Sequence, residues 1–105
     1  MIKRLTEESF LRQILLLARI KGWRSAHFRP ARTAHGWRTP VSGDGKGFPD
    51  LVLVKGKKLL LVELKLDRGK TSPEQEQWLR SLAQAGVKVA VWRPRDWAII
   101  VEALS

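Results

Sequence analysis

Apolar residues recur at helical spacing near the start of the chain, between residues 6 and 21. In "TEESFLRQILLLARIK" they stand three and four positions apart, at Phe10, Leu11, Ile14, Leu15, Leu17 and Ala18. Thr6, just before the pattern, suits an N-cap, and Gly22, just after it, suits a helix end. The pattern therefore predicts a first helix, and "WRSAHF" at 23–28 predicts a short strand after it.

Two short, continuous apolar runs in the middle of the chain favour strands. They are "DLVLV" at 50–54 and "LLLVEL" at 59–64, and "KGKK" joins them. Gly56, as the first central residue of a two-residue loop, suits a type II′ hairpin turn. That turn pairs Asp50 with Glu63, and residues paired in this way point to the same face of the sheet. Lys65, two positions beyond Glu63, shares that face.

The segment "TSPEQEQWLRSLAQAG" has the features of a second helix at both of its ends. Ser72 suits an N-cap and Pro73 the first helical position. Gln75, three positions after Ser72, suits the far half of a capping box, and Gly86 suits the helix end. A second helix is therefore predicted here.

The last quarter of the chain reads as two more strands. "VKVAVW" at 87–92 and "AIIV" at 98–101 are rich in β-branched residues, and the turn "RPRD" separates them. The resulting order is helix, strand, hairpin, helix, strand, strand. It predicts a single α/β domain over residues 1–105, with a mixed β-sheet flanked by helices.

The charge of the chain points to a polyanionic partner. Twenty Lys and Arg against ten Asp and Glu give a net charge of +10, and nucleic acid is the leading candidate. No acidic residue occurs from Ser9 to Gly43, an interval that holds Arg12, Arg19, Lys21, Arg24, Arg29, Arg32 and Arg38. The alternative is a basic solvated surface with no specific ligand.

Residues 29–47 are rich in Gly, Pro, Arg and Thr and are predicted to form a loop. Long loops in small domains are often functional, and Trp37 offers a surface on which a base could stack. An irregular connector with a partly buried tryptophan is the alternative. The candidate DNA-contacting residues in and beyond this segment are Arg29, Arg32, Trp37, Arg38, Lys46, Arg68 and Lys70.

Cysteine is absent, which excludes a disulfide framework and a thiolate zinc site. The two histidines are His27 and His35, so a metal would be held mainly by oxygen ligands. The longest apolar run, at 14–18, is too short to cross a membrane, and no signal peptide is evident. We expect the protein inside the cell, in the cytoplasm.

The paired carboxylates of Asp50 and Glu63 are the feature of the sequence that points to a chemical activity. Two like charges opposed on a sheet repel each other, and burying them would cost several kcal/mol without compensation. A divalent cation such as Mg²⁺ would compensate, with Asp50, Glu63 and the backbone carbonyl of Leu64 as ligands. Lys65 would then pair with a phosphate oxygen or hold the attacking water. The plainer alternative is an ion pair between Glu63 and Lys65, with Asp50 capping a turn.

The chain resembles a known nuclease family at these residues. "GFPD", a hairpin and "VELK" resemble the signature of the PD-(D/E)XK nucleases, whose acid, acid and lysine fall on Asp50, Glu63 and Lys65. The wider pattern looks like the VRR-NUC (virus-type replication-repair nuclease) branch in its stand-alone form. That likeness rests on "TEESF", "GW", "GFPDLVLV", "VELKLDRGKTSPEQEQWL", "AGVKVAVWRP" and the final "D", and covers nearly the whole chain.

The resemblance implies a restriction-endonuclease-like fold, dependence on Mg²⁺ or Mn²⁺, and hydrolysis of DNA phosphodiester bonds. Stand-alone members are similar to phage and bacterial enzymes that act on branched DNA, such as Holliday junctions, as homodimers. In the family a glutamate of the first helix approaches the metal. Glu7 is preferred here because it shares a face with Phe10 and Ile14, while Glu8 stays open and both could simply favour the helix N-terminus.

Two further positions have alternative roles. Gln75 corresponds to a family position beside the site, and it equally suits the capping box with Ser72. His27 is expected to act as a hydrogen-bonding partner in preference to a general base, since a metal would supply the nucleophile.

The sequence thus favours a structure-selective DNA endonuclease that recognises shape through phosphate contacts. A restriction-type or nonspecific nuclease on the same fold is one alternative, and a non-catalytic DNA-binding replication accessory protein is another.

Overall fold

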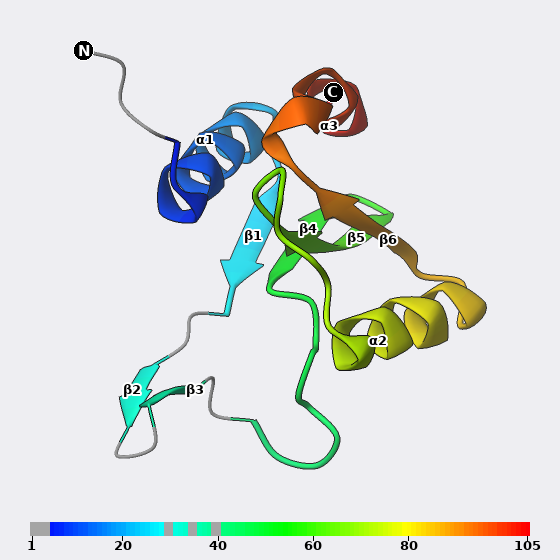
Figure 1. Cartoon of the computed structure of the whole chain (residues 1–105). Helices are drawn as coiled ribbons and strands as arrows, with labels where there is room; N and C mark the ends of the chain where they lie inside the picture. The colour runs from blue at the N-terminus through cyan, green and yellow to red at the C-terminus, as the bar shows by residue number, and fades with distance from the viewer. Residues whose placement is uncertain (1–4, 29–30, 34–35, 39–40) are drawn as a thin grey trace.

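A four-stranded sheet forms the centre of the molecule in the computed structural model, with helices on both of its faces (Figure 1). The structure describes residues 5–28, 31–33, 36–38 and 41–105, the two short internal segments by their backbone alone. The helices are α1 (Glu7–Ile20), α2 (Pro73–Gln84) and α3 (Trp97–Ala103), with a 3₁₀ turn, η1 (Pro94–Asp96), before the last. The strands are β1 (Arg24–His27), β2 (Ala31–Thr33), β3 (Gly36–Arg38), β4 (Leu51–Lys55), β5 (Lys58–Leu64) and β6 (Lys88–Trp92).

The sheet is mixed, as the sequence predicts. Its order is β1-β4-β5-β6; the first two pairings are antiparallel, and β5 pairs with β6 in parallel. The hairpin register is confirmed, because β4 and β5 pair Val52 with Leu61 and Leu51 with Val62. Gly56 takes a φ of +58° in the turn, while Lys57 keeps a negative φ, which is the type II′ pattern.

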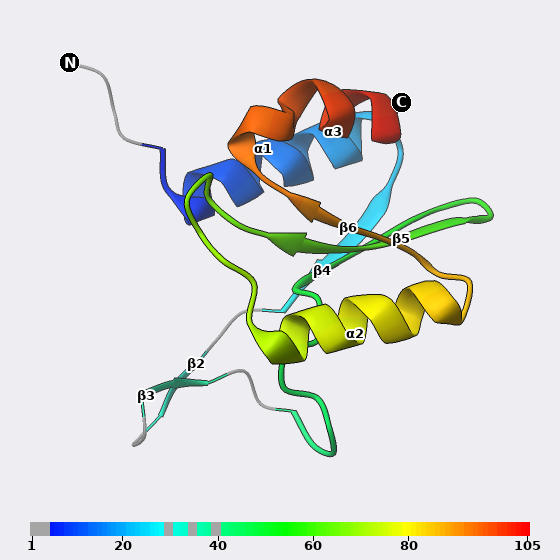
Figure 2. The ribbon, with the colours of Figure 1, turned by 45° about the vertical axis from the view of Figure 1, so that its right-hand side comes forward.

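The two faces of the sheet are covered unequally. Figure 2 shows α1 and α3 against one face and α2 against the other. Leu51 and Leu53 are fully buried on the α1 and α3 side, in one apolar cluster with Ile14 and Ile100. The structure describes every residue of α2, and none of them is completely buried. Strand alternation therefore places the main core on one face and leaves the face under α2 thinly covered.

Both predicted helices are confirmed together with their caps. The Thr6 hydroxyl accepts a hydrogen bond from the Ser9 amide at the start of α1. Ser72 and Gln75 form a reciprocal capping box at the start of α2, with Pro73 in its first turn. These local interactions satisfy amides that a helix start leaves unpaired.

The strand predicted at 98–101 is wrong, because these residues lie in α3. The β-branched run favours a strand locally, but Ile100 and Leu104 recur at helical spacing and both are fully buried. The indole of Trp23 also donates a hydrogen bond to the Leu104 carbonyl, at 2.9 Å. Burial in the apolar core beside Ile14 of α1 thus overrides the local preference.

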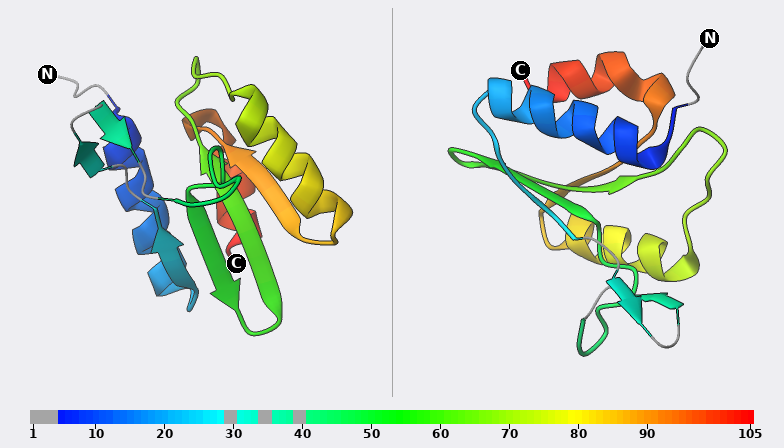
Figure 3. Two further views of the ribbon diagram at one scale, coloured as in Figure 1. Left: turned by 90° about the horizontal axis from the view of Figure 1, so that it is seen from below. Right: turned by 90° about the vertical axis from the view of Figure 1, so that its left-hand side faces the viewer.

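The predicted loop at 29–47 is also corrected in part. It contains β2 and β3, which pair as a small antiparallel hairpin that stands away from the main sheet (Figure 3). Arg29 and His35 lie outside the described residues. Among the described residues, no helix has the length and apolar character needed to span a bilayer.

Candidate active site

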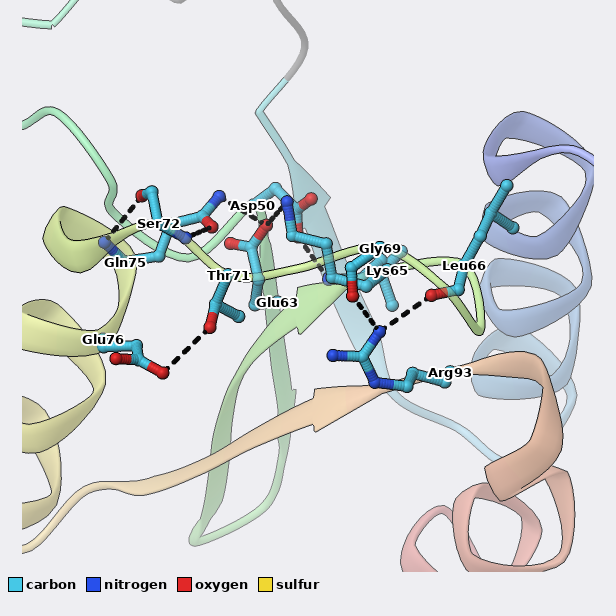
Figure 4. Close-up of polar contacts among 11 residues, drawn as sticks. Asp50, Glu63, Lys65, Leu66, Gly69, Thr71, Ser72, Gln75, Glu76 and Arg93 are labelled. Atoms are coloured by element: carbon cyan, nitrogen blue, oxygen red, sulfur yellow. Dashed lines mark hydrogen bonds and ion pairs between the residues drawn. The ribbon is translucent and has the colours of Figure 1, made fainter.

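Asp50, Glu63 and Lys65 converge on the α2 face of the sheet, as the hairpin register predicts (Figure 4). One carboxylate oxygen of Asp50 accepts a hydrogen bond from the Leu64 amide at 3.2 Å. The Lys65 ammonium lies 3.9 Å from a carboxylate oxygen of Glu63. The amide of Lys65 donates to the Trp92 carbonyl of β6, so the lysine backbone is held by the neighbouring strand.

Both carboxyl groups of the site have raised pKa values, and Glu63 is also buried. Glu63 is only 4% exposed. Burial, the nearby Asp50 and, to a smaller extent, Glu7 raise its pKa to about 8, against the lowering effect of Lys65. Burial also raises the pKa of Asp50 to about 6, although the hydrogen bond from Leu64 lowers it. Burial thus favours the protonated form of each carboxyl more than water does, and a divalent cation would favour the ionised forms.

Gln75 fills both of the roles that the sequence leaves open. Its side-chain oxygen accepts from the Ser72 amide at 2.8 Å, which completes the capping box. Its side-chain nitrogen donates to Glu63 at 2.9 Å. The start of α2 is therefore joined directly to the buried carboxylate, and Gln75 fixes the orientation of Glu63.

The two glutamates at the start of α1 differ in their surroundings. Glu8 pairs with Arg12 at 2.8 Å on the exposed side of the helix. The charge of Glu7 raises the pKa of both site carboxyls, which places it on the side of the site. Within the described ranges, no three Asp, Glu or His side chains come close enough to form a metal-binding group. Glu7 as a metal ligand therefore stays a prediction, as does the Leu64 carbonyl.

The candidate DNA-contacting residues surround the site unevenly. Arg68 and Lys70 are exposed on the segment that follows Lys65. Lys46 is exposed as well and pairs with Glu74 of α2 at 3.4 Å. Arg32, Trp37 and Arg38 belong to the β2–β3 hairpin by their backbone. Their side chains, like the whole of Arg29, lie outside what the structure describes.

The sequence does not identify Arg93 as part of the site, because "RPRD" there reads only as a turn. Its guanidinium donates to the carbonyls of Leu66 and Gly69, at 2.8 and 2.5 Å (Figure 4). These carbonyls are the two ends of a turn that Gly69 closes by donating to Leu66. A Cβ atom on Gly69 would lie 3.4 Å from the Lys65 side chain. Arg93 thus holds the turn that packs beside Lys65.

His27 lies away from the carboxylates. The register of β1 and β4 pairs it with Leu51. Since Leu51 points to the core and its neighbour Asp50 points to the opposite face, His27 also faces the core side. The expected role of His27 as a hydrogen-bonding partner in preference to a general base stays a prediction.

Comparison with known proteins identifies a family. The model of the VRR-NUC domain matches residues 3–96, most of the chain. Among solved structures, Archaeoglobus fulgidus Hjc, a Holliday junction resolvase from an archaeal hyperthermophile, is similar at 21% identity and a TM-score of 0.48. The match covers 82% of this chain and 67% of that one. A search of curated proteins finds no match.

Proposed function

Because this chain belongs to the VRR-NUC family, we propose that it is a metal-dependent, structure-selective DNA endonuclease acting on branched DNA such as Holliday junctions. The observation that carries the proposal is the buried Glu63 opposite the partly buried Asp50, with Lys65 on the same face. Folding alone does not favour two opposed carboxyls that are withdrawn from water, one wholly and one in part, so their position calls for a ligand that needs both.

The donor set fits a hard divalent cation. Two carboxylates with water in the remaining positions is the usual protein environment of Mg²⁺, which rarely has a cage of protein ligands. Mn²⁺ accepts the same oxygen ligands. Asp50 and Glu63 would hold the ion, and the Leu64 carbonyl and Glu7 are candidate further ligands. When bound, the ion would supply Lewis-acid stabilisation of the phosphate and activation of water.

The chain's own groups have separate parts in the reaction. The Lys65 ammonium, 3.9 Å from Glu63, is placed to pair with a phosphate oxygen and to stabilise the extra negative charge of the transition state. Gln75 keeps Glu63 oriented through its hydrogen bond at 2.9 Å. Arg93 keeps the turn after Lys65 in place. The exposed Arg68 and Lys70 on that segment would position the DNA backbone.

A homodimer is part of the proposal. Cutting both strands of a junction needs two active sites, which twofold symmetry would supply from two copies of this chain. Sedimentation with and without a four-way junction tests this part. A monomer under both conditions would contradict it, while leaving nicking by one site intact.

The proposal is tested by a cleavage panel over linear, flap, splayed and four-way DNA in Mg²⁺ and in a chelator. We expect metal-dependent cleavage with a preference for branched substrates. Lys65→Ala should lower the rate about 100- to 1,000-fold, as loss of a group that stabilises transition-state charge does. Lys57→Ala, an exposed lysine in the hairpin turn, is the matched control and should cleave as the wild type does.

Other results would favour the alternatives. Equal rates on linear and four-way DNA would support a restriction-type or nonspecific nuclease. DNA binding with no cleavage by the wild type in Mg²⁺ or Mn²⁺ would support an accessory protein without catalysis. Each outcome overturns a different part of the proposal.

A further inference from the structure

Phe28 lies in the same row of the sheet as the two carboxylates. The register of β1 and β4 pairs Ala26 with Val52 and His27 with Leu51. One position further, the Phe28 amide donates to the Asp50 carbonyl at 2.9 Å, so Phe28 is opposite Asp50. Opposed residues point to the same face with Cβ atoms about 4.5–5.5 Å apart. Phe28, Asp50 and Glu63 therefore form one row across the α2 face.

The ring of Phe28 is supported from one side and partly open to solvent. It makes an edge contact with Phe48, at 6.0 Å between ring centroids and 69° between planes. Phe48 in turn makes an edge contact with Trp78 of α2, at 5.1 Å and 80°. The Trp78 indole donates to the Asp44 carbonyl, which fixes this aromatic row to the loop before β4. Phe28 nevertheless remains 42% exposed.

An exposed aromatic ring next to a site that binds a DNA phosphate can contact a DNA base. In a nucleotide the base and the phosphate are separated by one sugar, so a phosphate at the carboxylates brings an adjacent base to the region of Phe28. A base within a duplex is covered on both faces by its neighbours. At a branch or in a single strand one face is free, and an aromatic side chain can stack on it.

We propose that Phe28 stacks on a base adjacent to the scissile phosphate and so selects DNA that offers an unstacked base. This inference rests on the proposed function, because it takes the DNA phosphate to sit at Asp50 and Glu63. It assigns the preference for branched DNA to one side chain, in addition to the basic residues that hold the backbone.

The first arm of the test is cleavage under single-turnover conditions. Phe28→Ala should lower the rate on a four-way junction about 10- to 100-fold, the loss expected for one base-stacking contact. On linear duplex it should change the rate less than threefold. Phe28→Tyr keeps the aromatic face and should restore junction cleavage, whereas Phe28→Leu keeps apolar contact with Phe48 and should not. Ile99→Ala, at an exposed site on α3, is the matched control.

The second arm measures binding, in the Lys65→Ala background so that cleavage does not interfere. Each base around the branch is replaced in turn by an abasic site, and Kd is measured with and without Phe28→Ala. We expect one position at which the abasic site weakens binding as much as Phe28→Ala does, with little further loss when the two changes are combined. Coupling of this kind identifies two groups that contact each other.

Two results would overturn the inference. One is that, at every position, the abasic site and Phe28→Ala raise Kd independently, so that the combined change is the product of the two separate changes. The other is that Phe28→Ala slows junction and linear cleavage equally while lowering the melting temperature, which would make Phe28 a structural residue only. A wild type that cleaves no DNA would overturn the proposed function instead, and the coupling in the binding arm would still decide the role of Phe28.

Discussion

The two faces of the central sheet are built from the same strands but carry different kinds of side chain. On the α1 and α3 face, Leu51 and Leu53 are fully buried among apolar side chains. On the α2 face, Asp50 and Val52 are partly buried and Val54 is exposed, and α2 buries none of its own residues completely. In a chain of 105 residues, strand alternation thus separates the apolar packing that stabilises the fold from the charged groups that we propose carry the chemistry.

The largest expected loss of stability comes from a substitution on the α1 and α3 face of the sheet. Leu53→Ala should lower the free energy of unfolding by about 2–5 kcal/mol, because the fully buried leucine leaves a cavity. Val52→Ala changes the neighbouring residue, which is only half-buried on the other face, and should cost less than about 1.5 kcal/mol. Denaturant unfolding of both variants measures the difference. Equal losses would show that the two faces contribute alike to stability.

A smaller effect is expected at the edge of the site, from Arg93→Ala. Without the two hydrogen bonds to Leu66 and Gly69, the turn beside Lys65 loses its fixed position. We expect kcat to fall about 10- to 100-fold, the range for a displacement of about 1 Å. The affinity for Mn²⁺, measured by calorimetry, should stay within about twofold.

Added guanidinium ion provides the control for Arg93. If the side chain acts by holding the two carbonyls, guanidinium should restore part of the activity of Arg93→Ala and leave the wild type unchanged. Loss of Mn²⁺ affinity together with kcat would contradict this role, because it would mean that the variant disturbs the carboxylates themselves.

The mildest perturbation, because it changes no residue, is a change of pH in the metal-free protein. The folded-state pKa of Glu63 is about 8, against an ordinary value of 4.5. Between these two pH values the folded state holds a proton that the unfolded state has lost, so stability should fall as the pH rises through this window. The slope is at most about 1.4 kcal/mol per pH unit for one group. Asp50, with a pKa raised to about 6, adds to the fall at lower pH.

Thermal unfolding at pH 5, 6.5 and 8 in a chelator and in Mg²⁺ measures this dependence. We expect the stabilisation by Mg²⁺ to increase with pH, because the cation binds the ionised carboxylates and displaces their protons. Glu63→Gln should flatten the curve in the chelator, while Glu102→Gln, at an exposed site on α3, should not. A wild-type curve that does not fall between pH 5 and 8 would contradict the electrostatic description of the site.

What the sequence predicts correctly here depends mainly on local interactions. Gly56 determines the turn, the turn determines the register, and the register brings Asp50 opposite Glu63. The caps at Thr6 and Ser72 are likewise set by residues three positions apart. The VRR-NUC family is confirmed for the same reason, since its motifs are short and contiguous.

The features that the sequence does not predict depend on contacts between distant residues. Residues 98–101 form part of a helix because Ile100 and Leu104 are buried against other elements, whereas the β-branched run itself favours a strand. Arg93 reaches carbonyls 24 and 27 residues earlier in the chain. Arg93 directly follows β6, the strand that pairs in parallel with β5. This position is the one feature of the sequence that could have indicated that Arg93 lies near Lys65.

The central claim is that Asp50 and Glu63 bind a divalent cation that is required to cut DNA. The most direct test is the single-turnover cleavage rate of a four-way junction as Mg²⁺ is titrated, for the wild type and for Asp50→Asn. We predict no cleavage in the chelator, a saturable rise with Mg²⁺ for the wild type, and at least a 100-fold lower rate for Asp50→Asn. Wild-type cleavage in the chelator, or equal titration curves for the two proteins, would contradict the claim.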